Sequence, residues 1–373
     1  MKNYIYKKDR LKMTSLNIVY DAGSEHETGT NYKGCMHLME HLLCKTFKDM
    51  YSIFTANGIK WNAGTREDMV YVWFEGLASR FTHEMKIEIL KKLTDTIECV
   101  TKEEFETEKN VVLQEYFDTI IDDASADYMN MMRIYWNNFT PIGCSDDIKS
   151  FTYDDMLNVY EKYFKHPARI VEVGPEQTKE LELFCEEPVM TWFNHNKPKF
   201  GYYKNPLVDI SGKTKTPVYM LFPKTVLKKD YPYLRVGMSM LTEDLDSPYY
   251  KALRVDSGLS YYVLGNIEKH ISGGMMYVCA CTDTMNAGKL EDTMIKLSEN
   301  VYDHLTKERF ETVMEGMKVG REMEKVLKYM YTQRHTNIST LKMPNDLNKI
   351  EFEDVCYVMS RYFADVKVIR GNF

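Results

Sequence analysis

Short apolar runs alternate with longer amphipathic stretches along the first half of the chain, which predicts a mixture of strands and helices. Met85, Ile89 and Leu93, for example, recur at the spacing of a single helix face. The predicted helices cover residues 31–48, 81–98, 124–137 and 151–164, with a further long helix after Thr101, and the predicted strands cover 11–23, 60–65, 69–74 and 169–174. Thr101 followed by Glu104 is the pattern of a capping box at a helix start.

The second half of the chain resembles the first. Lys102–Thr107 recurs as Lys307–Thr312 with five of six residues identical, and Asp155–Phe164 is echoed by Asp354–Phe363. The two matches have offsets of 205 and 199 positions, and a strand is expected after each copy of the second one. Chance could produce two short matches, but the shared order favours an internal repeat. We therefore predict a domain at 1–180, a linker at 181–213 that is rich in proline, and a second domain at 214–373.

Composition narrows the class of protein. The 373 residues are 44% hydrophobic and 28% charged, as in ordinary globular proteins, and the net charge of −7 argues against a general role in nucleic-acid binding. The eight cysteines contain no C-x-x-C pair, which favours free thiols in a reducing compartment. No signal-peptide or membrane-spanning run is visible, so we expect a cytoplasmic protein without a membrane partner.

The sequence His37-x-x-Glu40-His41 is the strongest candidate for chemistry. Two histidines four residues apart lie on one face of a helix, where both imidazoles can bind one metal ion. Glu40 lies near the same face, and the string is the zinc-protease motif His-Glu-x-x-His in reverse order, the inverzincin pattern. The alternative is a helix whose histidines make only ordinary polar contacts.

Two glutamates further along the chain could complete such a site. Glu108 and Glu115 are seven residues apart in a predicted helix, so they share a face. A buried carboxylate is costly unless a cation meets it, and a metal held by the histidines could be that cation. The alternative is that both are solvated. At the corresponding positions the second half has Val313 and Gly320, and it has no second His-x-x-Glu-His motif.

Six segments, taken in order, resemble the pitrilysin/insulinase group of zinc peptidases, peptidase family M16, and in particular its short mitochondrial-processing-peptidase-like branch. These are Asp21–Ser24, His37–His41, Asn62–Thr65, Glu108–Glu115, Thr140–Gly143, and Arg254 with Tyr261. The resemblance implies an α+β fold of two tandem α/β sandwich halves. In this LuxS/MPP-like metallohydrolase fold, each half has an antiparallel-rich sheet with helices packed on one side.

The resemblance also implies roles for individual residues. His37, His41 and Glu115 would bind one Zn²⁺ per chain, and Glu40 would be the general base. Glu108 is too far along the helix from Glu115 to bind the same ion, so we expect it to orient a ligand histidine.

Four further residues match family positions that contact the substrate. Asn62 and Ala63 would lie on an edge strand that receives a peptide, although the residues alone also fit an ordinary paired strand with Trp61 in the core. Arg254 and Tyr261 would act near the scissile bond. Without the resemblance they would be interpreted as a surface arginine and a strand tyrosine.

The resemblance implies a zinc metalloendopeptidase that cleaves unstructured peptides or leader sequences. Two halves form only half of the closed chamber of the family, so a homodimer, or a heterodimer with a related M16-like subunit, is expected. One alternative is a catalytically silent binding or scaffold subunit of a processing-peptidase-like dimer. A second is a zinc hydrolase that acts on bonds other than peptides.

Overall fold

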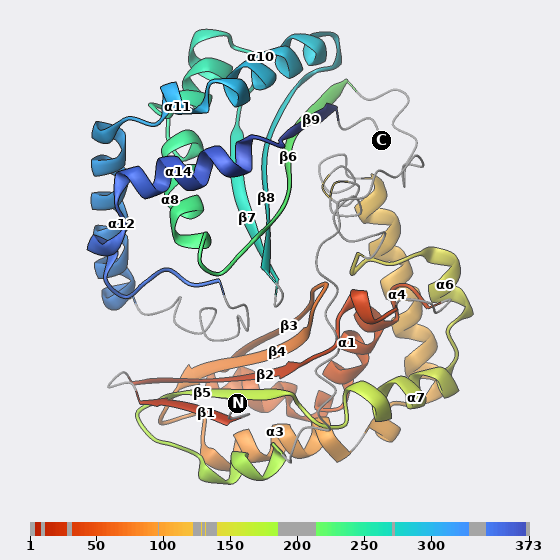
Figure 1. Cartoon of the computed structure of the whole chain (residues 1–373). Coiled ribbons are helices and arrows are strands. Elements are labelled where there is room, and N and C mark those ends of the chain that lie inside the picture. The colour runs from red at the N-terminus through yellow and green to blue at the C-terminus, as the bar shows by residue number, and fades with distance from the viewer. Residues whose placement is uncertain are drawn as a thin grey trace. The chain divides into compact units, whose positions relative to one another are not determined.

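The computed structural model describes residues 4–8, 12–27, 32–95, 97–121, 128, 131, 140–185, 214–270, 273–327 and 341–370. The chain divides into two compact units, the first drawn mainly from residues 1–119 and 139–195 and the second from 196–328 and 338–373 (Figure 1). Each unit has its own sheet and its own hydrophobic core. The helix predicted at 124–137 falls almost entirely outside the described residues.

The first unit contains a five-stranded sheet in the order β1-β5-β2-β4-β3. Its strands are β1 (Tyr4–Lys8), β2 (Met13–Tyr20), β3 (Lys60–Thr65), β4 (Val70–Leu77) and β5 (Arg169–Gly174). β1 and β5 run parallel, whereas the other neighbours are antiparallel. Within the described residues β3 pairs with β4, so β3 forms one edge of this sheet.

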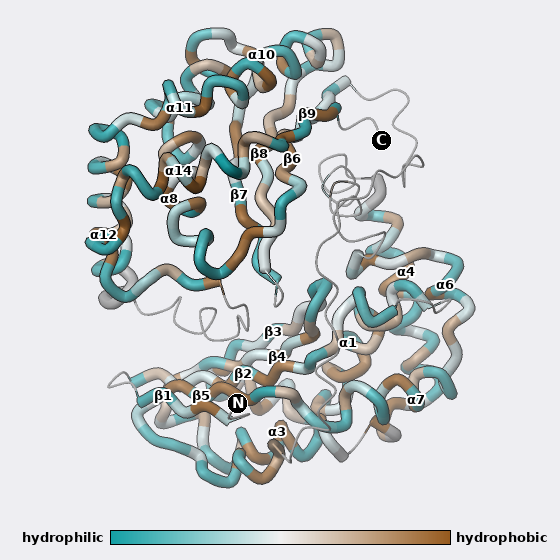
Figure 2. The backbone as a smooth tube through the Cα atoms, in the orientation of Figure 1, coloured by the Kyte–Doolittle hydropathy of each residue, from teal (hydrophilic) through white to brown (hydrophobic). Residues whose placement is uncertain are grey.

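Helices cover the face of this sheet to which Leu16, Ile18 and Phe74 point, and the two layers enclose the first core. Hydrophobic segments on β2, β4 and β5 are visible as brown tube in Figure 2. The helices are α1 (Cys35–Lys45), α2 (Tyr51–Asn57), α3 (His83–Asp95), α4 (Lys102–Ile121), α6 (Ser145–Ser150) and α7 (Tyr153–Tyr163). Along β4, buried positions alternate with half-buried ones, as expected for a strand with helices packed on one face.

Several sequence predictions can be compared with these bounds. The capping box is confirmed, because the Thr101 N–H donates to Glu104 Oε2 at 3.0 Å and the Glu104 N–H donates to Thr101 Oγ1 at 3.2 Å. The helix predicted at 31–48 is shorter, since α1 begins at Cys35 and ends at Lys45. The 3₁₀ helix Lys179–Phe184 spans the predicted boundary at residue 180 and buries Leu181 in the first core, and the domain bounds stay a prediction.

The second unit contains a four-stranded antiparallel sheet in the order β7-β8-β6-β9. Its strands are β6 (Lys215–Val226), β7 (Val263–His270), β8 (Gly273–Asp283) and β9 (Lys367–Arg370). Its helices are α8 (Tyr231–Thr242), α9 (Pro248–Tyr250), α10 (Ala287–Glu299), α11 (Val301–His304), α12 (Lys307–Leu327) and α14 (Phe352–Phe363). Among the helices in the described ranges, none has the length and apolar character required to cross a bilayer.

The two units repeat the same order of elements at their ends. Helix α12 begins at Lys307 as α4 begins at Lys102, and α14 leads into β9 as α7 leads into β5. The repeated sequence segments therefore mark equivalent helices. The predicted α+β fold of two halves, each an antiparallel-rich sheet with helices, is confirmed.

Candidate metal centre

The start of α1 is fixed by contacts on two sides. Gly34 precedes the helix with φ 99°, and a Cβ at Gly143 would lie 2.3 Å from its Cα. Because only glycines allow the two backbones to approach so closely, the turn at Gly143 packs directly against the helix start. The buried Glu27 carboxylate accepts hydrogen bonds from the N–H groups of Gly34 and Met36, both at 2.9 Å. These bonds satisfy N–H groups that a helix start leaves unpaired.

His37 and His41 project from successive turns of α1 toward Glu115 of α4. Their ring centroids are 5.0 Å apart. Glu115 Oε2 lies 3.4 Å from His37 Nε2, and Glu115 Oε1 lies 3.7 Å from His41 Nε2. One ligand atom from each of the three residues can be chosen so that all lie within 4.8 Å of one another. The structure thus brings together the three residues predicted as metal ligands, here called the HHE cluster.

The geometry of the HHE cluster fits a small divalent cation. Both nitrogen–oxygen distances exceed the usual 2.7–3.2 Å of a hydrogen bond, but ligands at zinc distances in a tetrahedron are separated by about 3.3–3.5 Å. Burial, and then the neighbouring His41, lower the pKa of His37 to about 4, so this imidazole is neutral near pH 7, as a metal ligand requires. Two imidazoles and one carboxylate are a donor set found in catalytic zinc sites.

Glu108 precedes Glu115 on α4 and contacts His41, one of the two histidines. Its Oε2 lies 3.2 Å from His41 Nδ1, and its Oε1 lies 2.7 Å from Lys45 Nζ. The side chain is buried, and Lys45 balances its charge. Glu108 therefore lies where a carboxylate that orients a ligand histidine should be. By contrast, His37 Nδ1 is buried and has no hydrogen-bond partner in the described residues.

Sequence reasoning did not identify Lys45. Lys45 is one turn beyond His41 on α1, so its spacing alone could have placed it on the same face of α1 as His41. A lysine at the end of a helix is common, however, and only the packing of α1 against α4 shows which acid it meets.

Glu40 lies beside the HHE cluster and contacts the edge strand. Its Oε2 accepts a hydrogen bond from Thr65 Oγ1 at 2.8 Å. Burial raises the pKa of the Glu40 carboxyl, while the bond from Thr65 and the neighbouring His41 oppose this rise. Glu40 is therefore a partly buried carboxyl that has His41 and Glu115 as charged or polar neighbours.

Asn62 and Ala63 lie on β3, at the edge of the first sheet. Asn62 is exposed and Ala63 is half-buried. Trp61 packs against the core and stacks on Tyr51 with ring centroids 5.2 Å apart. The two interpretations of this segment are therefore compatible, because the strand is an edge strand and also anchors Trp61.

Arg254 and Tyr261 lie in the second unit and contact each other. The Arg254 guanidinium carbon is 4.6 Å from the centre of the Tyr261 ring and 5.6 Å from that of Tyr250. Tyr261 is 79% exposed, so its hydroxyl is accessible. The structure brings these two residues together within their own unit, and their catalytic role stays a prediction.

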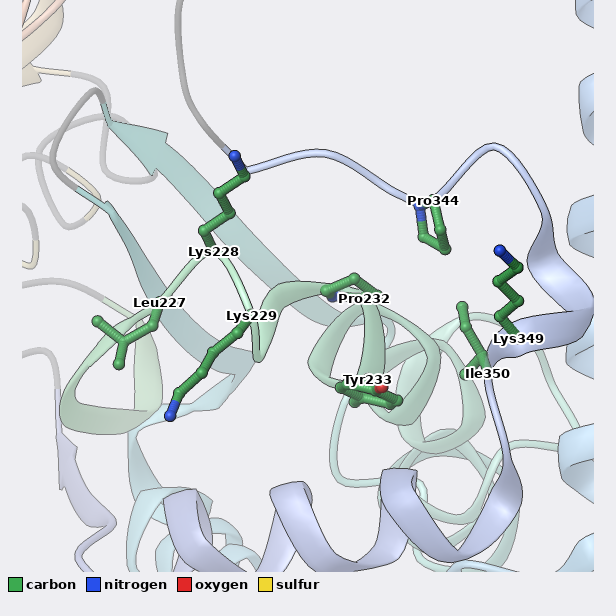
Figure 3. Close-up of a pocket in the computed structure, with 8 residues that line it drawn as sticks. All are labelled: Leu227, Lys228, Lys229, Pro232, Tyr233, Pro344, Lys349 and Ile350. Atoms are coloured by element: carbon green, nitrogen blue, oxygen red, sulfur yellow. The ribbon is translucent and has the colours of Figure 1, made fainter.

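The second unit also has a pocket of about 580 Å³ beside the start of α8 (Figure 3). Its lining residues are Leu227, Lys228, Lys229, Pro232, Tyr233, Pro344, Lys349 and Ile350. None of these is a carboxylate, histidine or cysteine, so the pocket lacks the usual metal ligands. We therefore place the candidate chemistry at the HHE cluster of the first unit.

Comparison with known proteins supports this interpretation of the fold. Residues 150–317 match the family described as peptidase M16 inactive domain. The fold and this match support a relation of the chain to the M16 peptidase family. The matched residues run from α6 into α12 and so exclude the HHE cluster, which means that the word inactive describes a part of the chain outside it. A comparison with curated proteins found no match.

Solved structures share the fold of this chain at low sequence identity. A protease from Helicobacter pylori aligns over 98% of this chain and 96% of its own, with a TM-score of 0.76 and 16% identity. The peptidase M16 inactive domain from Pseudomonas fluorescens aligns over 98% and 94%, with a TM-score of 0.71 and 14% identity. A chain of complex III2 from Candida albicans aligns over 98% and 92%, with a TM-score of 0.74 and 11% identity.

Proposed function

We propose that the chain is a zinc-dependent metallopeptidase that cleaves unstructured peptides or leader sequences. The observation that carries the proposal is the HHE cluster, in which His37, His41 and Glu115 converge at distances suited to one Zn²⁺. Membership in the short processing-peptidase-like branch of M16 is part of the same proposal. So is assembly into a homodimer, or a heterodimer with a related subunit, in the cytoplasm.

Each residue of the site has a distinct task in peptide hydrolysis. Zinc, when bound, polarises the scissile carbonyl and lowers the pKa of a water toward about 7. Glu40 accepts the proton of the attacking water through the carboxylate oxygen that Thr65 leaves free, and then delivers it to the leaving amine. Glu108 holds the His41 ring in the orientation that points Nε2 at the cluster.

The edge strand β3 gives the substrate a place to bind. An extended peptide can add to a sheet edge through backbone hydrogen bonds, and this suits unstructured substrates of varied sequence. Asn62 and Ala63 lie on this edge, in the same strand as Thr65. We assign them to substrate binding. Arg254 and Tyr261 carry donors of the kind that stabilise a developing oxyanion, and we retain that role from the family resemblance.

A second candidate function is a catalytically silent binding or scaffold subunit. The family description of residues 150–317 as an inactive domain favours it, as does the similarity to a chain of complex III2 from Candida albicans. The intact HHE cluster favours the peptidase, because a scaffold has no need to bring two histidines and an acid together.

Peptide cleavage by zinc-loaded protein tests the proposal. Cuts in a library of unstructured peptides are mapped by mass spectrometry for the wild type, Glu40→Gln and Glu115→Ala. We expect the wild type to cut, Glu40→Gln to bind zinc without cutting, and Glu115→Ala to lose both zinc and cleavage. Glu104→Gln is the matched control, since Glu104 lies on the same helix and pairs with Lys48 outside the cluster. Cleavage that survives in both site variants contradicts the proposal, and zinc binding without any cleavage by the wild type favours the scaffold.

A further inference from the structure

Thr65 connects the edge strand to the proposed general base. It is the last residue of β3, and it pairs with Val70, whose side chain is buried in the first core. Thr65 therefore points to the same side of the sheet as α1, and its hydroxyl donates to Glu40 Oε2 at 2.8 Å. Asn62 and Gly64 point to the opposite side. Within the described part of the chain, Thr65 is the one hydrogen-bond donor to the Glu40 carboxylate.

This single bond has a consequence for the orientation of the carboxylate. The last torsion of a glutamate side chain is broad and nearly two-fold, so an unrestrained carboxylate swings between orientations. A threonine is held stiffly at χ1 by its β-branch, and a donor on a paired strand is a fixed point. The bond thus occupies Oε2 and leaves Oε1 without a donor among the described residues, so Oε1 is available to accept a proton.

We propose that Thr65 is a positioning residue that holds Glu40 in the orientation for proton transfer. This inference rests on the proposed peptidase function. A residue that only satisfies a polar neighbour would stabilise the fold without affecting the reaction. A positioning residue affects kcat with little effect on KM, because it acts on the base and not on the substrate.

Thr65→Val and Thr65→Ser separate these possibilities. Valine keeps the shape and β-branch of threonine but removes the donor, whereas serine keeps the donor. The matched control is Thr55→Val on α2, where the exposed hydroxyl donates to the backbone oxygen of Tyr51 at 3.1 Å. The two readouts are crystal structures of the metal-free variants, and kcat and KM on an internally quenched, unstructured peptide at a measured zinc stoichiometry.

We expect the Glu40 carboxylate to be displaced in Thr65→Val and to keep its place in Thr65→Ser. We expect kcat to fall roughly 10- to 100-fold in Thr65→Val, the size of one hydrogen bond to a charged group. KM should stay within about twofold and zinc binding should be unchanged, and Thr65→Ser should recover most of the activity. Thr55→Val should match the wild type.

Two results on the position of Glu40 overturn the inference directly, and a third does so through zinc binding. One is an unchanged Glu40 position and kcat in Thr65→Val, and the other is a failure of Thr65→Ser to restore the position of Glu40. If the wild type cuts no peptide, the proposed function fails, and the structures of the variants still decide whether Thr65 holds Glu40. Loss of kcat together with loss of zinc would show that Thr65 maintains the site as a whole, and this too counts against the inference.

Discussion

Replacing Glu108 with glutamine should weaken zinc binding, although Glu108 is not a proposed ligand. Glu108 is 7% exposed, and its two oxygens contact His41 Nδ1 at 3.2 Å and Lys45 Nζ at 2.7 Å. Glutamine keeps the shape of the side chain but removes its charge. The amide is a weaker acceptor for the imidazole N–H, and Lys45 loses its counter-charge.

The size of the effect follows from the two contacts. Loss of a carboxylate that orients a ligand histidine lowers metal affinity about 10- to 100-fold, which corresponds to about 1.4–2.8 kcal/mol. The Lys45 side chain is 33% exposed, so solvent screens its ion pair with Glu108, and such pairs contribute up to about 1 kcal/mol. Most of the loss should therefore come from the His41 contact, and Lys45→Met should weaken zinc binding less than Glu108→Gln does.

Competition with a chelator of known zinc affinity at pH 7.5 measures this effect. The matched control is Glu104→Gln, one turn earlier on α4, where Glu104 pairs with Lys48. We expect the control to bind zinc within about twofold of the wild type, since exposed pairs contribute little. An affinity of Glu108→Gln within twofold of the wild type would refute the orienting role. A larger loss of zinc affinity in Lys45→Met than in Glu108→Gln would show that the effect comes from the ion pair.

Three further predictions concern the first unit. Lys86→Met removes the cation 2.8 Å from the buried Glu172 and should lower the free energy of unfolding by about 3–5 kcal/mol in urea at pH 7. Burial raises the pKa of Glu172, but Lys86 together with the hydrogen bonds from Tyr4 and the Thr178 N–H lowers it by more, so the stability from the ionised group is present above about pH 4.3. It is lost as the pH falls through the lowered value, and the difference between variant and wild type should therefore shrink in acid. In metal-free protein, the His37 ring resonances should be constant from pH 8 to 5.5 and titrate near pH 4, as NMR would show. Glu27→Ala removes both acceptors at the start of α1 and should lower the free energy of unfolding by about 1–2 kcal/mol, as thermal unfolding would show.

Local periodicity explains which parts of the site could be predicted from the sequence. A helix fixes the face shared by His37 and His41, and likewise the face shared by Glu108 and Glu115, without knowledge of the rest of the fold. The capping box at Thr101 fixes where α4 begins. Spacing within a helix does not show that the two faces meet, and here the family resemblance supplied the expectation that Glu115 faces the histidines.

Contacts between elements explain what the sequence could not show. Thr65 and Lys45 have ordinary local surroundings, and their significance depends on which side chain packs opposite them. Glu27 caps α1 from seven to nine residues away through a backbone path that no periodic pattern encodes. The place of Leu181 in the first core likewise depends on contacts that the short helix Lys179–Phe184 makes with other elements.

The second unit shows that the fold does not require the acids of α4. Helix α12 begins with nearly the same residues as α4, yet it has Val313 in place of Glu108 and Gly320 in place of Glu115. Val313 packs against the second core, and a Cβ at Gly320 would meet no atom within 4 Å. Val313 thus fills this position as an uncharged residue, which needs no neutralising partner. In α4 the same position carries a buried carboxylate that needs both Lys45 and His41, which is costly for stability and understandable if the first unit retains a metal site.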